Sequence, residues 1–136
     1  MILTFVDAGV LIAAARGGTE QAERALAILE DPSRQFAASF FLRLEVIPQA
    51  VFNGRRAEVA LYEAYFAAVA AWATDLATVA ERALEEASTY GVQAMDALHV
   101  AAAAIVGAQE LVTTERPTRS IHRARSVNVV SINPVA

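Results

Sequence analysis

Apolar residues follow two alternating patterns along this chain: short continuous runs and longer segments with helical spacing. The short runs are rich in β-branched residues and predict strands at 2–6, 35–38, 110–113 and 127–132. The longer segments repeat apolar residues every three or four positions. They predict helices at 7–15, 20–30, 56–73, 78–90 and 95–106, with a further helix after Ser39.

Several residues mark where these elements begin and end. Thr19 is a predicted N-cap, and Ser39 is expected to cap the helix that follows it. Gly91 and Gly107 are expected to end the two helices before them. Pro48 lacks an amide donor, so it should bend or shorten the helix that contains it.

Strands separated by helices predict one α/β domain over residues 1–136, with a largely parallel sheet. In such sheets ligands bind beyond the carboxyl ends of the strands. Asp7 and Glu115 each follow a predicted strand at that end. Glu45 and Asp96 would have to reach the same place from helices.

These four acids, Asp7, Glu45, Asp96 and Glu115, all lie beside strongly apolar runs. A carboxylate near a core is costly unless it is paired or bound to a metal. All 11 basic residues are arginine, so no lysine is available as a partner. If the acids converge, a divalent cation is the simplest compensating charge, and a metal-dependent site is the leading hypothesis.

Composition restricts the function classes further. No apolar stretch reaches the roughly 20 residues that span a bilayer, and we expect no signal peptide, no membrane anchor and a cytoplasmic protein. The absence of cysteine suits a reducing compartment. A net charge of -4 argues against a general nucleic-acid coat protein, although it does not exclude a nuclease. The segment 116–125 contains four arginines, which could hold phosphate beside an acidic pocket.

Four motifs, in order, resemble those of the PIN domain, a metal-dependent ribonuclease fold found in many toxins of toxin–antitoxin systems. The resemblance covers nearly the whole chain and is most specific in its third motif. The motifs are Phe5-Val6-Asp7 with Val10-Leu11-Ile12, Ser39 with Leu44-Glu45-Val46, Met95-Asp96-Ala97-Leu98-His99-Val100-Ala101, and Leu111-Val112-Thr113-Thr114-Glu115.

The resemblance implies a PIN-like three-layer α/β/α sandwich with a mainly parallel sheet of four to five strands. It also implies VapC-like, endonucleolytic hydrolysis of RNA that depends on Mg²⁺ or Mn²⁺ and leaves a 5′-phosphate. Asp7 and Asp96 would bind metal directly, Glu45 would bind metal or orient the attacking water, and Glu115 would assist with a second ion. Thr113 would be a supporting hydroxyl.

The expected partners are RNA, a cognate antitoxin and a second copy of the chain. Arg116 and Arg119 are candidate contacts to RNA phosphates. The chain departs from the family pattern at Ala8-Gly9, where small polar residues are usual, and at Glu115, where aspartate is usual. We expect catalysis to survive both changes.

Two features allow more than one interpretation. The aromatic stripe Tyr62, Tyr65, Phe66, Val69 and Trp72 is either core or a partner-facing groove, and core packing is favoured. His99 lies one turn after Asp96 and could be a ligand or a base, but we expect a hydrogen-bonded structural histidine.

Other functions fit less well. A phosphoacceptor receiver domain needs a lysine, and a dinucleotide-binding domain needs a glycine-rich turn after its first strand. A stand-alone PIN nuclease that is not a toxin and a catalytically idle PIN-like binding module stay open.

Overall fold

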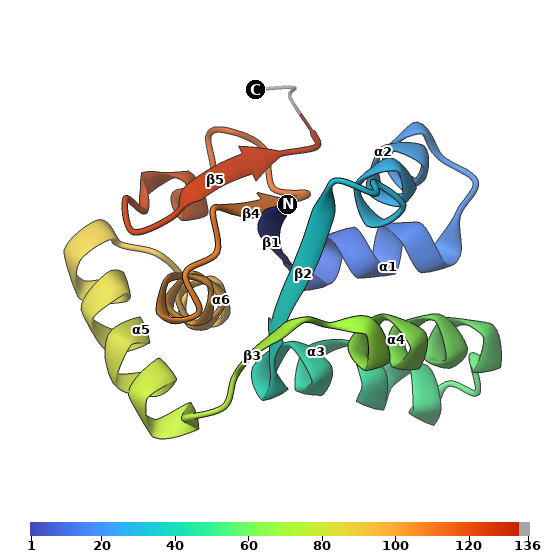
Figure 1. Cartoon of the computed structure of the whole chain (residues 1–136), viewed down its shortest axis with the longest axis horizontal. Coiled ribbons are helices and arrows are strands. Elements are labelled where there is room, and N and C mark those ends of the chain that lie inside the picture. The colour runs from blue at the N-terminus through green and yellow to red at the C-terminus, as the bar shows by residue number, and fades with distance from the viewer. Residues whose placement is uncertain (134–136) are drawn as a thin grey trace.

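The computed structural model describes residues 1–133, within which a five-stranded sheet is flanked by six α-helices (Figure 1). The elements in chain order are β1 (Ile2–Val6), α1 (Ala8–Arg16), α2 (Glu20–Leu29), β2 (Arg34–Ser39), α3 (Phe40–Phe52), α4 (Arg56–Ala68), β3 (Ala71–Ala73), α5 (Leu76–Tyr90), α6 (Ala94–Ile105), β4 (Glu110–Thr113), the 3₁₀ helix η1 (Ser120–Arg123) and β5 (Asn128–Ser131).

All five strands are parallel, in the order β3-β2-β1-β4-β5. From β1 the chain first builds the sheet toward β3, and it then returns to add β4 and β5 on the other side of β1. The strand order therefore reverses between β1 and β4. In open α/β sheets a crevice forms at such a reversal, outside the carboxyl ends of the strands. The predicted α/β class and parallel sheet are confirmed.

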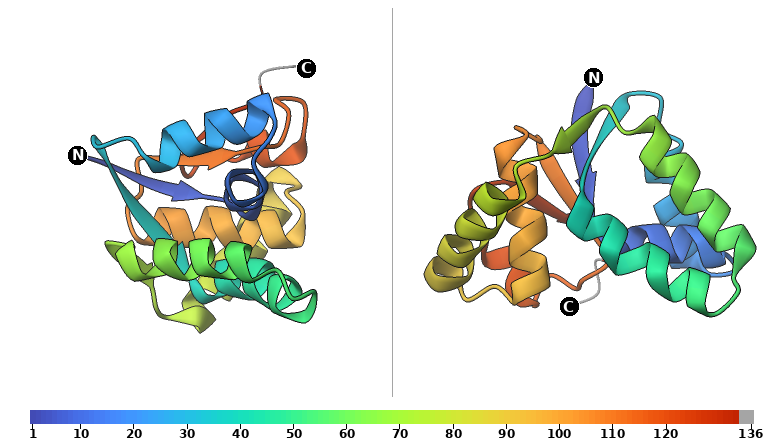
Figure 2. Two further views of the ribbon diagram at one scale, coloured as in Figure 1. Left: turned by 90° about the vertical axis from the view of Figure 1, so that its right-hand side faces the viewer. Right: turned by 90° about the horizontal axis from the view of Figure 1, so that it is seen from below.

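Helices cover both faces of the sheet. Figure 1 shows α5 and α6 on one side and α1 and α2 on the other, and Figure 2 shows the same arrangement from two further directions. Helix α6 contacts β1, β2, β3 and β4, and α5 packs on α6. Because both faces are covered, the central strands are apolar along their length, with Phe5, Val6, Leu111 and Val112 fully buried. Within residues 1–133 no helix is long and apolar enough to cross a membrane.

The predicted helix over 56–73 is too long. Helix α4 ends at Ala68, and Val69 is already extended, with φ -61° and ψ 130°. The amide of Ala70 then donates to the carbonyl of Phe36 at 2.9 Å, and β3 pairs with β2. Pairing with the sheet edge outweighs the helical propensity of this alanine-rich segment. Trp72 therefore belongs to a strand.

The aromatic stripe is mainly core, as favoured. Tyr62 and Phe66 are buried, and Tyr65 is partly buried with its hydroxyl 3.4 Å from the carbonyl of Ala37. Trp72 is partly exposed and contacts the ring of Phe66, with the ring centroids 5.8 Å apart.

Helix α3 differs from the expectations in two respects. The helix continues four residues beyond Pro48, so the proline does not shorten it. Pro48 and Leu44, whose carbonyl loses its usual donor, are both exposed, so water can bond that carbonyl. Ser39 occupies the N-cap position but makes no capping hydrogen bond. Its hydroxyl is buried and has no partner within residues 1–133.

Gly9 allows a close approach between α1 and the segment after β4. A Cβ atom at this position would lie 2.1 Å from Oγ1 and 3.2 Å from Cβ of Thr114. A small polar side chain cannot be accommodated without a shift, which gives a physical reason for glycine at the position where the family usually has such a residue.

We predict that Gly9→Ala lowers the free energy of unfolding by about 1–3 kcal/mol, because overpacking exceeds the gain in helix propensity. Thr114→Ala in the same chain should recover part of the loss, since it removes the nearest atom. Urea denaturation of the two single variants and the double variant measures this coupling. A stabilising Gly9→Ala change, as expected at an ordinary helical glycine, would contradict the prediction.

Candidate active site

Asp7 lies where β1, β4 and α1 meet. Its amide donates to the carbonyl of Val112 on β4 at 3.0 Å. Its carboxylate caps α1 by accepting a hydrogen bond from the amide of Val10 at 3.2 Å, and it also accepts one from the hydroxyl of Thr113. The residue is only 5% exposed. Asp7 thus lies at the carboxyl end of β1, as the sequence predicted, and strand order places this end at the reversal.

Thr113 and Glu115 reach the same edge from the end of β4. The Thr113 hydroxyl is fully buried, and besides donating to Asp7 it accepts a hydrogen bond from the amide of Glu115 at 3.0 Å. The predicted role of Thr113 as a supporting hydroxyl agrees with these contacts. The Glu115 side chain turns outward and pairs with Arg119, whose Nε lies 3.4 Å from Oε2.

Glu45 reaches this edge from α3 and is held by α6. Nε2 of His99 lies 2.6 Å from Oε1 of Glu45. The His99 ring is buried, is tilted against the ring of Phe5, and has no partner for Nδ1 within residues 1–133. An Nε2–H tautomer leaves only an acceptor unpaired at Nδ1, whereas a protonated ring would bury an unpaired donor. The expectation of a hydrogen-bonded histidine is confirmed.

Asp96 lies in the first turn of α6, where the helix dipole favours an acid. It is half-buried, and its carboxylate has no hydrogen bond or ion pair in the described part of the chain. Burial raises the pKa of Asp96, and the nearby carboxylates of Glu115 and Glu45 raise it further. Asp96 therefore lies within electrostatic reach of both acids.

Asp7 is coupled to the same group. Burial raises the pKa of Asp7 from 3.8 to about 6, despite the hydrogen bonds from Thr113 and Val10, and the Asp96 carboxylate adds to the rise. The four acids singled out in the sequence thus form one electrostatic cluster with Asp96 at its centre. Contrary to the sequence-based expectation, the absence of lysine does not leave all four acids unpaired, because His99 contacts Glu45 and Arg119 contacts Glu115.

The donor chemistry of this cluster fits a hard divalent cation. Mg²⁺ prefers oxygen ligands and keeps several of its waters, so few carboxylates are needed. Burial is the main cause of the raised pKa values of Asp7 and Asp96, and the nearby cationic groups offset it only in part. As the side chains stand, however, no three acids or histidines among residues 1–133 are grouped so that they could hold an ion.

Beside the cluster is a cavity of about 190 Å³. It is lined by Gln93, Asp96, Glu115, Thr118, Arg119 and Ser120. Arg119 is therefore at the site, as predicted, whereas Arg116 is exposed and does not line this cavity. The sequence analysis missed Gln93, Thr118 and Ser120. Only proximity to Asp96 and to the arginine segment could have drawn attention to them.

The chain matches one protein family. The sequence matches the PIN domain over residues 4–121. No curated protein matches the chain at a significant level.

Solved structures share the fold. The crystal structure of VapBC2 from Rickettsia felis, bound to a DNA fragment from its promoter, aligns with a TM-score of 0.71 at 12% identity over 96% of this chain and 98% of that chain. A toxin–antitoxin complex from Klebsiella pneumoniae gives 0.69 at 22% identity over 93% and 95%. VapC20 from Mycobacterium tuberculosis, a toxin that cleaves the sarcin–ricin loop, gives 0.65 at 20% identity over 79% and 86%.

We predict that Asp7→Asn stabilises the metal-free protein at pH 7. The unfolded chain ionises Asp7 near 3.8 and the folded chain near 6, so the folded state binds more protons between these values and loses stability as pH rises through that window. The cost at pH 7 is on the order of 3 kcal/mol. Asparagine can still cap α1 while removing the charge.

The measurement is urea denaturation at pH 4 and pH 7 without divalent cations. The gain should appear at pH 7 and be small at pH 4. Asp75→Asn is the matched control, since Asp75 also caps a helix but is exposed and has a lowered pKa because of its hydrogen bonds from Thr78. An equal gain in both variants would rule out the buried charge as the cause.

Proposed function

The chain belongs to the PIN domain family, and from this premise we propose that it is a Mg²⁺- or Mn²⁺-dependent endoribonuclease, the toxin of a toxin–antitoxin pair. PIN domains are typically nucleases and generally depend on metal. The observation that carries the proposal is the coupling of Asp7, Glu45 and Glu115 to Asp96 at the reversal of strand order. Clustered carboxylates repel one another, and a cation would relieve this repulsion.

In this proposal the four acids share three tasks. Asp7 and Asp96 bind the cation directly, and Thr113 fixes the orientation of Asp7. Glu45, held by His99, binds metal or orients the attacking water. Glu115 assists a second ion and, through its contact with Arg119, keeps a guanidinium group beside the substrate phosphate.

Asp7 and Asp96 would hold the Mg²⁺, which would supply positive charge at the scissile phosphate and increase the acidity of the attacking water. Water then attacks phosphorus, the bond to the 3′-oxygen breaks, and the products carry a 5′-phosphate and a 3′-hydroxyl. Arg119, and Arg116 further out, bind neighbouring phosphates of the RNA.

The partners proposed are a cognate antitoxin and a second copy of this chain. The Klebsiella structure is a toxin–antitoxin complex, which supports the first. An apolar groove of about 520 Å³ between α2 and α4, lined in part by Leu26, Leu61 and Tyr65, offers room for an apolar segment of such a partner. A stand-alone nuclease would need no such partner.

The rival function is a protein-binding module without catalysis. The Glu45–His99 and Glu115–Arg119 contacts favour it, because they engage two of the acids without metal. Only the ribonuclease proposal predicts cleavage of RNA, so a cleavage assay distinguishes the two proposals.

We predict that the native chain cleaves RNA only with Mg²⁺ or Mn²⁺, and that Asp96→Asn lowers the rate by about two orders of magnitude or more. Single-stranded oligoribonucleotides and total tRNA serve as substrates. The same cations should raise the melting temperature of the native chain, and less so that of Asp96→Asn. Glu85→Gln on α5, which removes an exposed acid remote from the cluster, is the control.

Loss of activity in Glu85→Gln as well would point to a general effect of charge. If no cation changes either the melting temperature or the RNA, the binding module becomes the better proposal.

Helix α3 carries an exposed apolar face that supports the homodimer. Phe40, Leu44, Val51 and Phe52 are all more than half exposed. Single exposed apolar residues are ordinary, but a row of them on one helix is typical of an interface.

We predict that Leu44→Glu converts a native dimer to a monomer, because it places a charge within the buried apolar contact. Light scattering after size-exclusion chromatography gives the mass directly. Ile105→Glu, at the far end of α6, is the control and should leave the dimer intact. A monomeric native chain would refute the homodimer.

A further inference from the structure

A second cavity adjoins the acidic cluster at Glu45. It has a volume of about 280 Å³ and is formed by residues of α1, α3 and α4, with Arg55 just before α4. Its polar lining comprises Arg16, Glu45, Gln49, Asn53, Arg55 and Glu58. Pockets for drug-sized ligands begin at about 300 Å³, so this one suits a smaller group such as a single base with part of its sugar and phosphate.

The two arginines of this cavity are held in place by one carboxylate. Oε1 of Glu58 lies 3.2 Å from Nε of Arg16 and 3.6 Å from Nη1 of Arg55. Glu58 is largely shielded, with its side chain 14% exposed. Two arginines and two glutamates, Glu45 and Glu58, line the cavity, so an anion would be attracted by the guanidinium groups, which are about half exposed, and not by a net positive charge.

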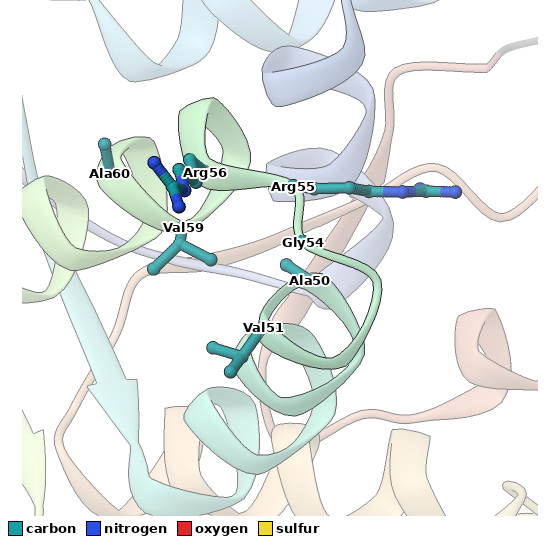
Figure 3. A pocket seen from close by; sticks show the side chains of 7 residues that line it. All are labelled: Ala50, Val51, Gly54, Arg55, Arg56, Val59 and Ala60. Carbon is teal, nitrogen blue, oxygen red and sulfur yellow. The ribbon is translucent and has the colours of Figure 1, made fainter.

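Arg55 and Arg56 both line a neighbouring apolar groove, but only Arg55 also lines this cavity. Figure 3 shows the groove lined by Val51 and Val59, with Arg56 beside it and Arg55 extending away from it. The two adjacent arginines therefore face different surroundings, which makes Arg56 a matched control for Arg55.

The cavity is continuous with the acidic cluster through Glu45. One oxygen of Glu45 contacts His99, and the side chain also lines this cavity. The smaller cavity adjoins the cluster at Asp96 and Glu115 and contains Arg119. The two cavities share no lining residue, but each is lined by an acid of the cluster and each contains arginine. A single RNA strand whose scissile phosphate lies over the acids would extend into both.

Two amide side chains give the second cavity a means of reading a base. Nδ2 of Asn53 donates to the carbonyl of Gln49 at 2.9 Å, which fixes the amide group and leaves its oxygen available. Gln49 is exposed, and its side chain makes no hydrogen bond within residues 1–133. Amide groups pair with the edges of unstacked bases, which is how proteins recognise single-stranded RNA.

We propose that this cavity binds the RNA nucleotide that flanks the scissile phosphate, with Arg16 and Arg55 on its phosphate and Gln49 and Asn53 on its base. The inference rests on the proposed ribonuclease function and adds to it a place where sequence preference is set.

A binding assay and a cleavage assay test the proposed nucleotide site separately. Binding of short, fluorescein-labelled single-stranded RNA of mixed sequence is followed by anisotropy in Mg²⁺ at several salt concentrations. Every chain in this assay carries Asp96→Asn, so that the RNA stays intact. Arg55→Ala should weaken binding about tenfold. It should also lower the slope of log affinity against log salt by about 0.7, the value for one phosphate contact on a single strand. Arg56→Ala should change neither quantity.

The loss of Arg55 can disturb Glu58 and the fold, and Gln49→Ala is a second variant that avoids this problem. It removes no charge, so the salt slope should stay constant. In the chain with Asp96 intact, it should alter the base preferred next to the cleavage site.

The outcomes distinguish the two proposals. If Arg55→Ala and Arg56→Ala bind RNA equally and Gln49→Ala keeps the base preference, the cavity is not a nucleotide site, although cleavage by the native chain would still support the ribonuclease. If the native chain cleaves nothing but Arg55→Ala still weakens binding, the nuclease proposal fails and the RNA site stands. Absence of any RNA binding overturns the inference.

Discussion

The buried carboxylate of Asp7 fixes the geometry on which the rest of the site depends. Its amide joins β1 to β4, while its side chain begins α1 and accepts a hydrogen bond from Thr113. These contacts orient two strands and one helix around the place where strand order reverses. Burial makes the negative charge costly, as the raised pKa shows. Asp7 therefore both organises the fold and would be stabilised by a nearby positive charge.

The surrounding residues offset the negative charge of the acidic cluster only in part. Thr113 offers Asp7 a hydroxyl, and in the tautomer that the burial of Nδ1 favours His99 offers Glu45 a neutral N–H. Neutral donors stabilise a carboxylate less than a full cation does. The one full cation in contact with an acid of the cluster, among the residues up to 133, is Arg119, and it is exposed and weakened by solvent. The centre of the cluster, Asp96, has no such partner. The site is therefore ordered by hydrogen bonds yet remains short of positive charge.

The sequence predicts the structural features that depend on local periodicity and on the positions of strand ends. The parallel sheet, the cap at Thr19 and the position of Asp7 at a strand end followed from such patterns, whereas Thr113 was singled out by the resemblance to the PIN domain. Contacts between distant segments could not be read in this way. The edge strand containing Trp72 exists because Phe36 supplies its neighbour, and the cavity beside Glu45 exists because α1, α3 and α4 meet there. No local sequence pattern at Arg16 or Gln49 indicates that these three helices meet.

The exclusive use of arginine has a consequence at this site. Arg16 and Arg119 each direct Nε at a carboxylate, which leaves the two terminal nitrogens of each guanidinium without a protein partner within residues 1–133. A guanidinium presents five donors in a fixed plane, so it can be held by an acid along one edge and bind phosphate along another. The compact ammonium of lysine has no such second edge. Arg16 and Arg119 are therefore each paired with a carboxylate, in cavities that acids of the cluster also line, and each keeps a free edge for the RNA phosphate that we propose it binds.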